Sequence, residues 1–299
     1  MKVLITGGSG FLGQALSKAL IARGDHVIVW SRDTSKHTPR KSASEWISSL
    51  EQISEAVDAV VNLAGANLFS GLWTQARKKT LRASRIDTTE TLMDWLSRQD
   101  KAPRVLLTGS AIGFYGDCSD TALTEQAPKG SDWAAQLVAD WEAAAQTASA
   151  NLKDLRVVSL RTGLVLGNGG LLKPLLPLFK LGLGGSLGDG QFWFSWIHVQ
   201  DWVEAVIHLL DKDSAVGPFN LCAPNPVRYK QFAYALGKTL HRPVFMTPPA
   251  WVLRLLLGEQ AKLLMSSTKT IPEKLQASGY SFQHTEIQQA LASVQASIK

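Results

Sequence analysis

Short apolar runs alternate with stretches of helical periodicity through the first half of the chain. The apolar runs lie near residues 2–5, 26–30, 58–63, 104–108 and 156–160, and the helical stretches lie near 11–23, 74–98 and 131–149. This order predicts an α/β fold built on a doubly wound parallel sheet with right-handed crossovers. A ligand is then expected beyond the carboxyl ends of the strands. Four loops fall there, namely Gly7–Gly13, Ser31–Arg32, Ala64–Gly65 and Ser110–Gly116.

After Arg161 the composition of the chain shifts to Gly, Leu and Pro. This predicts loops and short elements rather than another strand–helix unit. Residues 217–221 are again strand-like and are expected to return to the sheet. Helices are predicted near 229–240, 249–265 and 285–296. We therefore predict two interleaved domains. Residues 1–165 plus 197–222 form the sheet domain, and residues 166–196 plus 223–299 form a smaller α+β domain.

The first predicted strand runs directly into glycines at positions 7, 10 and 13. Gly7 permits a tight turn from strand to helix, Gly10 lets the backbone approach a pyrophosphate, and Gly13 lets the helix lie close to the strand. Phe11 and Leu12 complete the turn and open the helix, whose free N–H groups and positive dipole end would face the phosphates. The strand before the glycines and the second strand after Gly24 give this motif the expected context for a dinucleotide site.

Charge and composition narrow the class of ligand. The chain carries 31 Lys and Arg against 25 Asp and Glu, a formal charge of +6. The basic residues are dispersed and are not interleaved with aromatic residues, so we expect no nucleic-acid partner. An anionic ligand is the simpler explanation of the charge.

The cysteines and the N-terminal residues indicate the cellular compartment in which the protein is expected. Cys118 and Cys222 are far apart and show no metal-ligand spacing, which fits reduced, buried thiols and no bound metal. The chain enters its first strand at once, without the features of a signal peptide. Charged residues interrupt the apolar stretch Trp251–Met265, which is shorter than the ~20 residues of a membrane span. We predict a cytoplasmic protein with no membrane partner, in which this stretch is a helix packed on protein.

Several motifs resemble the extended short-chain dehydrogenase/reductases, and more closely an atypical branch described as an epimerase family or as nucleotide-sugar epimerase and cell-division inhibitor. They comprise Thr6–Gly13, Asp58–Gly65, Ser84–Arg85, Gly109–Ala111, Phe114–Gly116, Trp141–Glu142, Leu160–Gly163, Ser195–Asp201, His241–Pro243 and Ser278–Phe282, the last similar to a C-terminal domain of unknown function. The resemblance covers nearly the whole chain. It implies a Rossmann-type dinucleotide domain, a smaller substrate domain, and a pocket for a small molecule such as a nucleotide sugar.

The end of the second strand distinguishes NAD from NADP. An acidic residue there binds the ribose 2′-hydroxyl of NAD, whereas an Arg suits the 2′-phosphate of NADP. This chain has Ser31 and Arg32, and Asp33 comes two residues late. We therefore predict NADP, with a solvated surface role for Arg32 as the alternative.

Further cofactor contacts follow from the resemblance. It implies that Leu63, Ala64 and Gly65 pass beside the adenosine ribose and the pyrophosphate, and that Arg85 reaches a phosphate. Val165 is expected to flank the nicotinamide, where the predicted sheet strand near 156–160 ends. The neighbouring cations Arg77 to Arg82 are predicted to form an ordinary solvated face.

The catalytic pattern of the wider family is incomplete in this chain. Its members use a Ser or Thr together with Tyr-x-x-x-Lys on one helix, in which the Lys lowers the pKa of the phenol for proton transfer. If Glu142 matches the Glu that follows that pair, then Ala134 and Val138 stand at the Tyr and Lys positions. The remaining catalytic candidates are Ser110 and Tyr115, although their spacing is one residue longer than in sugar epimerases. A packing role for Tyr115 is the alternative.

Three other groups invite a functional interpretation. Tyr234 and Lys238 have the family spacing but lie in the C-terminal region, on a helix not expected to reach the nicotinamide. His198 and Asp201, three residues apart, could act as an acid–base pair, although an N-cap made by Asp201 at the start of a helix is the simpler interpretation. The aromatic residues at 192–196 fit either a substrate pocket or a core between two domains.

The sequence thus favours an NADP-binding, epimerase-like or reductase-like protein that acts on an unidentified small molecule. Two alternatives stay open. One is a non-catalytic regulator that responds to NADP, which the missing Tyr and Lys would fit. The other is an ordinary NAD-dependent nucleotide-sugar epimerase, which Ser31–Arg32 and the Ala134 and Val138 positions disfavour. The oligomeric state is not readable from the sequence.

Overall fold

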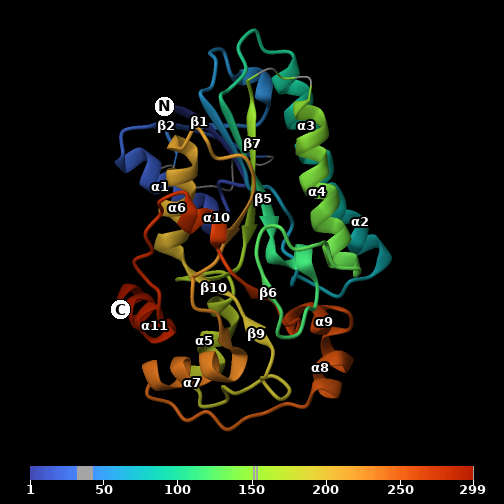
Figure 1. The fold of residues 1–299 in the computed structure, drawn as a ribbon, viewed down its shortest axis with the longest axis vertical. Helices are drawn as coiled ribbons and strands as arrows, with labels where there is room; N and C mark the ends of the chain where they lie inside the picture. Colours follow the sequence, from blue (N-terminus) through green and yellow to red (C-terminus); the bar gives the residue numbers. More distant parts are fainter. Residues whose placement is uncertain (32–42, 151, 153, 299) are drawn as a thin grey trace.

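A seven-stranded parallel sheet forms the centre of the protein. The computed structural model describes residues 1–31, 43–150, 152 and 154–298 (Figure 1). The strand order is β11-β7-β5-β4-β1-β2-β3, and every pair in it is parallel. The strands are β1 Lys2–Thr6, β2 His26–Trp30, β3 Glu45–Ile47, β4 Ala59–Asn62, β5 Val105–Ala111, β7 Arg156–Thr162 and β11 Gly217–Leu221. The predicted doubly wound α/β sheet is confirmed, and residues 217–221 complete it beside β7.

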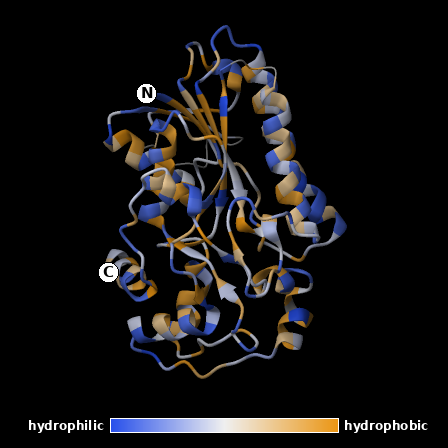
Figure 2. Ribbon diagram, viewed as in Figure 1, coloured by the Kyte–Doolittle hydropathy of each residue, from blue (hydrophilic) through white to orange (hydrophobic). Residues whose placement is uncertain are grey.

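Helices cover both faces of the sheet because its strands are apolar on both sides. In β1, Val3 and Ile5 join one buried cluster, with α1 (Phe11–Ala22) and α6 (Val199–Asp211), while Leu4 joins another with α3 (Ile86–Ser97) and α4 (Trp133–Ser149). Successive side chains of a strand point to opposite faces, so one run of apolar residues serves both layers. Figure 2 shows this pattern as largely hydrophobic strands between two-faced helices.

Two predicted helices are each divided in two. The stretch 74–98 forms α2 (Gln75–Ala83) and α3, with the break at Ser84 and Arg85. The stretch 249–265 forms α8 (Ala250–Leu257) and α9 (Gln260–Leu264), divided at Gly258, which has φ +57°. A positive φ is accessible to glycine and ends a helix of L-residues. In the described part of the chain, no helix has the length and apolarity that crossing a membrane requires.

A smaller lobe lies beyond the carboxyl edge of the sheet. Its helices are α5 Leu172–Lys180, α7 Tyr229–Thr239 and α11 Ile287–Ile298, accompanied by the short strand pairs β8 Leu164–Leu166 with β10 Trp196–His198 and β9 Trp193–Phe194 with β12 Val227–Arg228. Phe194, Trp196, Tyr229 and Phe232 are buried in its core. Two of the aromatic residues at 192–196 are therefore core residues.

The C-terminal region contacts both lobes. The strand β13 (Lys269–Thr270) pairs with β6 (Ala122–Leu123). After α10 (Glu273–Ala277), Tyr280 and Phe282 pack against the cluster on the sheet, and α11 then joins the core of the smaller lobe. The segment around Leu275–Phe282 is thus attached to the sheet rather than to the smaller lobe, whereas the predicted division into two domains stays a prediction.

Candidate functional site

A hollow of about 480 Å³ lies at the carboxyl ends of β1, β2 and β4. It is lined by Thr6, Gly7, Ser9, Gly10, Trp30, Ser31, Leu63, Ala64, Gly65, Ser84, Asp87, Thr88 and Thr91. This is the place at which open α/β sheets bind ligands. Three of the four loops expected there contribute to its walls, because parallel strands end at the same edge.

The glycine turn is shaped by close backbone contacts. Gly7 has φ +67°, and a Cβ on it would lie 2.5 Å from the Leu63 carbonyl oxygen. A Cβ on Gly13 would lie 2.3 Å from the Gly7 carbonyl oxygen. Only glycine fits these two positions without a shift of backbone. The N-cap of α1 is Gly10, which has no side chain to cap the helix, so the first N–H groups of α1 are available to an anion.

A buried polar network fixes the turn at the end of β4. Thr6 Oγ1 donates to Asn62 Oδ1 at 2.6 Å and accepts from the Ala64 N–H at 3.1 Å. Asn62 Nδ2 donates to Thr89 Oγ1 at 2.8 Å. The network links β1, β4 and α3 beneath Leu63–Gly65, the segment expected beside the ribose. Thr6 and Asn62 fall within the motifs named above, but no role was predicted for them or for Thr89, although a polar residue at the end of an apolar strand is a usable signal.

Ser84 belongs to the Ser84–Arg85 motif of the resemblance, whereas the polar residues that α3 contributes to the hollow were missed. Ser84, Thr88 and Thr91 line the hollow together with Asp87. Asp87, Thr88 and Thr91 lie along one face of α3, so helical periodicity could have identified them. Asp87 is the single acid among the described residues of the lining.

Ser31 and Arg32 are the residues expected to distinguish NADP from NAD, and the structure describes only Ser31. Trp30 and Ser31 line the hollow at the end of β2, as the site prediction requires. Arg32, on which the NADP prediction rests, lies outside the described residues. The described end of β2 carries no acidic side chain of the kind that binds the 2′-hydroxyl of NAD.

Arg85 lies behind the hollow rather than in its lining. Its guanidinium donates to the carbonyl oxygens of Leu81 and Ala66, both at 3.1 Å, and sits 5.2 Å from the ring centre of Trp141. Burial lowers the pKa of Arg85 to about 10, and the charge of Arg77 adds to this effect. A Cβ on Gly65 would lie 3.0 Å from the Arg85 guanidinium carbon. The side chain thus supports the Gly65 backbone from behind, and its expected contact with a phosphate stays a prediction.

Phe11, Leu12 and Val165 lie around the start of α1. The Phe11 ring packs against the backbone of Gly167 and Gly169, where a Cβ would come within 2.7 Å of it. Leu12 and Val165 belong to the cluster between the sheet and α1. The glycine turn is therefore tied to the 167–170 loop through Phe11.

The two catalytic candidates are joined by one buried polar chain. Ser110 Oγ donates to Glu142 Oε1 at 2.5 Å. Arg161 donates to both carboxylate oxygens of Glu142, at 2.8 and 2.9 Å, and to Tyr115 Oη at 3.0 Å. Tyr115 Oη in turn donates to Asn220 Oδ1 at 2.7 Å. Strands β5, β7 and β11 and helix α4 thus contribute to a single network, and Glu142 and Asn220 are members that sequence reasoning did not predict.

Tyr115 is held in a way that opposes proton transfer. The side chain is 1 % exposed, and burial raises its pKa to about 12 against the opposing charge of Arg161. Its hydroxyl already has a donor and an acceptor among protein groups. This geometry favours the packing role that was the alternative interpretation. Ser110 is the better placed of the two candidates, because its hydroxyl contacts a carboxylate.

A hollow of about 290 Å³ opens beside Ala134, the position predicted to match the Tyr of the wider family. It is lined by Trp73, Asp132, Trp133, Ala134, Glu259, Lys262 and Leu263. Trp73 and Trp133 meet edge to face with ring centres 4.8 Å apart. Val138 is buried, one turn further along α4. The pair Tyr234 and Lys238 lies on α7 in the smaller lobe, where Tyr234 is 54 % exposed.

A wider hollow of about 700 Å³ lies between residues 117–120 and the smaller lobe. Arg228, Arg254, Asp189 and Phe192 contribute to its walls. Arg228 donates to Asp120 at 2.6 Å and lies 4.1 Å from the ring centre of Trp193. Phe192 is thus the aromatic residue of the 192–196 stretch that lines a hollow, whereas its neighbours at 194 and 196 are core.

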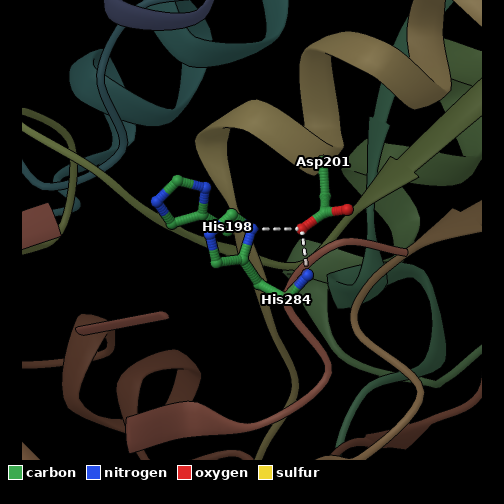
Figure 3. Close-up of side chains that lie close together, drawn as sticks. All are labelled: His198, Asp201 and His284. Atoms are coloured by element: carbon green, nitrogen blue, oxygen red, sulfur yellow. Dashed lines mark hydrogen bonds and ion pairs between the residues drawn. The ribbon is translucent and has the colours of Figure 1, made fainter. Parts of the chain in front are cut away.

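His198, Asp201 and His284 form a compact buried group (Figure 3). Asp201 accepts from the ring Nδ1 and the backbone N–H of His284, at 2.9 and 3.0 Å, and from the Gln283 N–H at 2.7 Å. His198 is the N-cap of α6 and accepts from the Gln200 N–H at 3.2 Å through Nδ1. The expected helix cap is therefore present, but His198 makes it rather than Asp201.

This donor set does not suit a metal ion. Both Asp201 oxygens already accept hydrogen bonds from the chain. The cap made by His198 leaves its proton on Nε2, where it blocks ligation. The two imidazole rings are stacked, with centres 3.8 Å apart. The three side chains connect α6 to residues 280–284. We call His198, Asp201 and His284 the α6 latch.

The sequence pattern of the NAD-dependent epimerase/dehydratase family matches residues 3–222, well over half of the chain. The protein belongs to this family. A domain of unknown function, DUF1731, matches residues 248–294, which include α8, α9 and α10. The resemblance inferred from the motifs is confirmed for both parts.

Relatives of this epimerase family member match nearly end to end. An epimerase family protein of Staphylococcus aureus is 36 % identical over 96 % of this chain and 97 % of its own length. The epimerase family protein YfhF of Bacillus subtilis is 33 % identical over 98 % of this chain and 97 % of its own. The crystal structure of the human epimerase family protein SDR39U1 with NADPH superposes with a TM-score of 0.88 at 31 % identity, covering 98 % of this chain and 99 % of that one. The Rossmann-type fold is thereby confirmed.

Proposed function

We propose that the protein binds NADP(H) in the hollow at the carboxyl edge of the sheet and acts on a small molecule as a reductase or an epimerase. The observation that carries the proposal is the hollow itself, with glycine backbone on one side and no acidic residue at the described end of β2. Ser31 and Arg32 then suit a 2′-phosphate. The NADPH bound by the human relative supports the same choice.

The small molecule is placed between the lobes. Two hollows support this placement, because the one beside Ala134 lies between the start of α4 and α9, and the wider one lies between residues 117–120 and the smaller lobe. Nucleotide sugars are candidate substrates, because a Corynebacterium glutamicum protein described as a nucleoside-diphosphate sugar epimerase is 30 % identical, with a TM-score of 0.77 over 98 % of this chain and 58 % of that one. Bound NADP(H) would supply hydride transfer.

Proton transfer in this proposal does not use a Tyr and Lys pair. Neither Ala134 nor Val138 carries a proton that can move, and Tyr115 is sealed in the core. Ser110 at the end of β5 is the remaining candidate: as its oxygen takes a proton from the substrate, its own proton would pass to the Glu142 carboxylate, to which it donates at 2.5 Å. Arg161 holds the Glu142 carboxylate in place on the other side. Ser110 positioned by Glu142 is the relay that we assign.

Calorimetric titration tests the nucleotide assignment. NADPH is expected to bind more tightly than NADH, and Arg32→Ala is expected to cost roughly 1–3 kcal/mol of NADPH affinity, the scale of a charge-assisted hydrogen bond, without changing NADH affinity. Arg98→Ala, at the exposed end of α3, serves as the matched control. Equal affinity for the two nucleotides would contradict the proposal.

The second candidate function is a non-catalytic regulator that changes conformation when NADP binds. The observation in its favour is the closed polar chain from Ser110 to Asn220, in which every candidate proton donor is already held by protein groups. A screen of carbonyl compounds and nucleotide sugars with NADPH separates the two candidates. Turnover that Ser110→Ala reduces by roughly 10²-fold or more supports the enzyme. Tight NADPH binding with no turnover across the screen supports the regulator.

A further inference from the structure

The charge of the chain is distributed very unevenly. Residues 163–188 and 214–258 contain seven Lys and Arg and not one Asp or Glu, and the 13 residues of 287–299 also lack acids. The other 228 residues outside the first two segments carry 24 basic and 25 acidic residues. These two segments therefore account for the whole positive excess of the protein. They build α5, α7 and α8 of the smaller lobe, and 287–298 forms α11.

A narrow apolar groove lies in this basic lobe. The helices α5 and α7 beside it stand at the end of the molecule away from the N-terminus (Figure 1). Three helices, α5, α7 and α11, form its walls, and its volume is about 240 Å³. The apolar lining consists of Leu172, Leu176, Leu236, Leu240, Leu291 and Val294. Four of these side chains belong to the buried core of the lobe, so the groove is an opening onto that core.

Two cations stand at the rim of the groove on different elements. Lys180 is the last residue of α5, and Arg242 follows α7. Neither has a carboxylate within ion-pair distance in the described part of the chain, and neither side chain donates a hydrogen bond to a described protein group. Two unpaired positive charges beside an apolar slot, with no acid on the surrounding helices, create a local positive potential that complements an anion.

We propose that this groove is a second ligand site, which binds a small amphipathic anion: a short acyl or alkyl chain along the leucines, with a carboxylate or phosphate head between Lys180 and Arg242. The slot is smaller than the roughly 300–1,000 Å³ typical of drug-sized ligands, so it takes a short chain rather than a ring system. Thr239 and Gln295 also line the groove and offer further polar contacts. The site is built from helices that do not line the nucleotide hollow, so it is independent of the proposed function.

Calorimetric titration of the full chain with three probes tests the chemistry of the ligand. Octanoate and octyl phosphate are expected to bind, and octanol is expected to bind at least tenfold more weakly because it lacks the charge. Lys180→Gln and Arg242→Gln should each weaken octanoate binding by about tenfold. Lys173→Gln in α5 and Lys238→Gln in α7 remove exposed cations outside the groove and should leave octanoate binding unchanged.

A second variant tests the location of the site. Thr239→Phe adds a large side chain to the groove wall without changing charge and is expected to abolish octanoate binding while NADPH binding, measured on the same sample, stays intact. Octanol binding as tight as octanoate, or octanoate binding unchanged in the double variant Lys180→Gln/Arg242→Gln, would overturn the proposal. Binding to vesicles of anionic phospholipid without binding of either soluble anion would also overturn it, since the surface would then recognise a membrane and not a single chain.

Discussion

Ser110 and Tyr115 lie at and just beyond the carboxyl end of β5, and protein groups hold both side chains. Glu142 accepts from Ser110, Asn220 accepts from Tyr115, and Arg161 connects the two halves. In this network Arg161 is buried and Glu142 is half-buried, and a charge removed from water is stable only when it is paired and hydrogen-bonded. Each residue in the chain therefore stabilises its neighbours, whether or not it takes part in a reaction.

The hydroxyl of Tyr115 provides a first test at the scale of single residues. Tyr115→Phe leaves Asn220 Oδ1 without a donor and removes an acceptor from Arg161, so we expect a loss of roughly 1–3 kcal/mol in the free energy of unfolding. NADPH affinity should not change, because Tyr115 does not line the nucleotide hollow. Urea denaturation and calorimetry measure the two quantities. A large loss of NADPH affinity with wild-type stability would place Tyr115 at the cofactor after all.

At the scale of elements, the turn from β1 into α1 is a contact between two stretches of backbone. A Cβ on Gly13 would meet the Gly7 carbonyl oxygen at 2.3 Å, closer than the structure can accept without moving α1. Gly13→Ala is therefore expected to weaken NADPH binding by more than tenfold and to lower the free energy of unfolding by roughly 1–3 kcal/mol.

Gly113→Ala is the matched control for that substitution. It adds the same methyl group beside a single neighbour, Leu263 Cδ1, at 3.8 Å. We expect wild-type NADPH affinity from this variant in calorimetry. Equal effects of the two substitutions would show that the close approach at Gly13 does not govern the turn.

The latch between α6 and the C-terminal segment predicts a local effect. Asp201 is fully buried and accepts hydrogen bonds from Tyr280, Gln283 and His284. Asp201→Asn replaces one accepting oxygen by a donating NH₂ group, so donors would face a donor. We expect a loss of roughly 2–4 kcal/mol in stability, within the range for a broken buried network, and faster amide hydrogen exchange at residues 280–284. Asp211→Asn, at the exposed end of the same helix, should change neither.

These elements also show how far the sequence could predict the structure. Six of the seven strands of the sheet were predicted closely because most are apolar runs between turn signals, and the glycine turn was predicted because its chemistry is local. The edge strand β3 was missed because it is only three residues long and begins with Glu45. The helix α5 was missed because Pro174 and Pro177 signal a break, although Pro174 falls in the first turn, where no intrahelical N–H is lost. The contact between Asp201 and His284 joins residues 83 positions apart, which no local pattern reports.

The whole molecule is held together by a chain that crosses repeatedly between its two lobes. After β7 the chain enters the smaller lobe, returns through α6 and β11, and returns again at Tyr280 before it ends in α11. Loss of the α6 latch would therefore loosen both lobes. We expect the two cores to unfold together. A buried titratable group at the start of α6, where the chain passes between the lobes, should therefore change the free energy of unfolding of the entire protein with pH.

His198 is that group. Burial lowers its pKa to about 4, and the neighbouring His284 adds to the effect while Asp201 opposes it. The unfolded chain binds the proton near pH 6.5, so between pH 6.5 and 4 the unfolded state holds more protons than the folded state. The stability that His198 contributes is fully present above pH 6.5 and is lost as the pH falls toward 4, by up to about 3 kcal/mol. His198→Asn keeps an oxygen that can cap α6 but does not titrate. Urea denaturation from pH 7 to 4 should therefore give a shallower fall in stability for His198→Asn than for the wild type, and parallel curves would show that His198 is not buried in its neutral form.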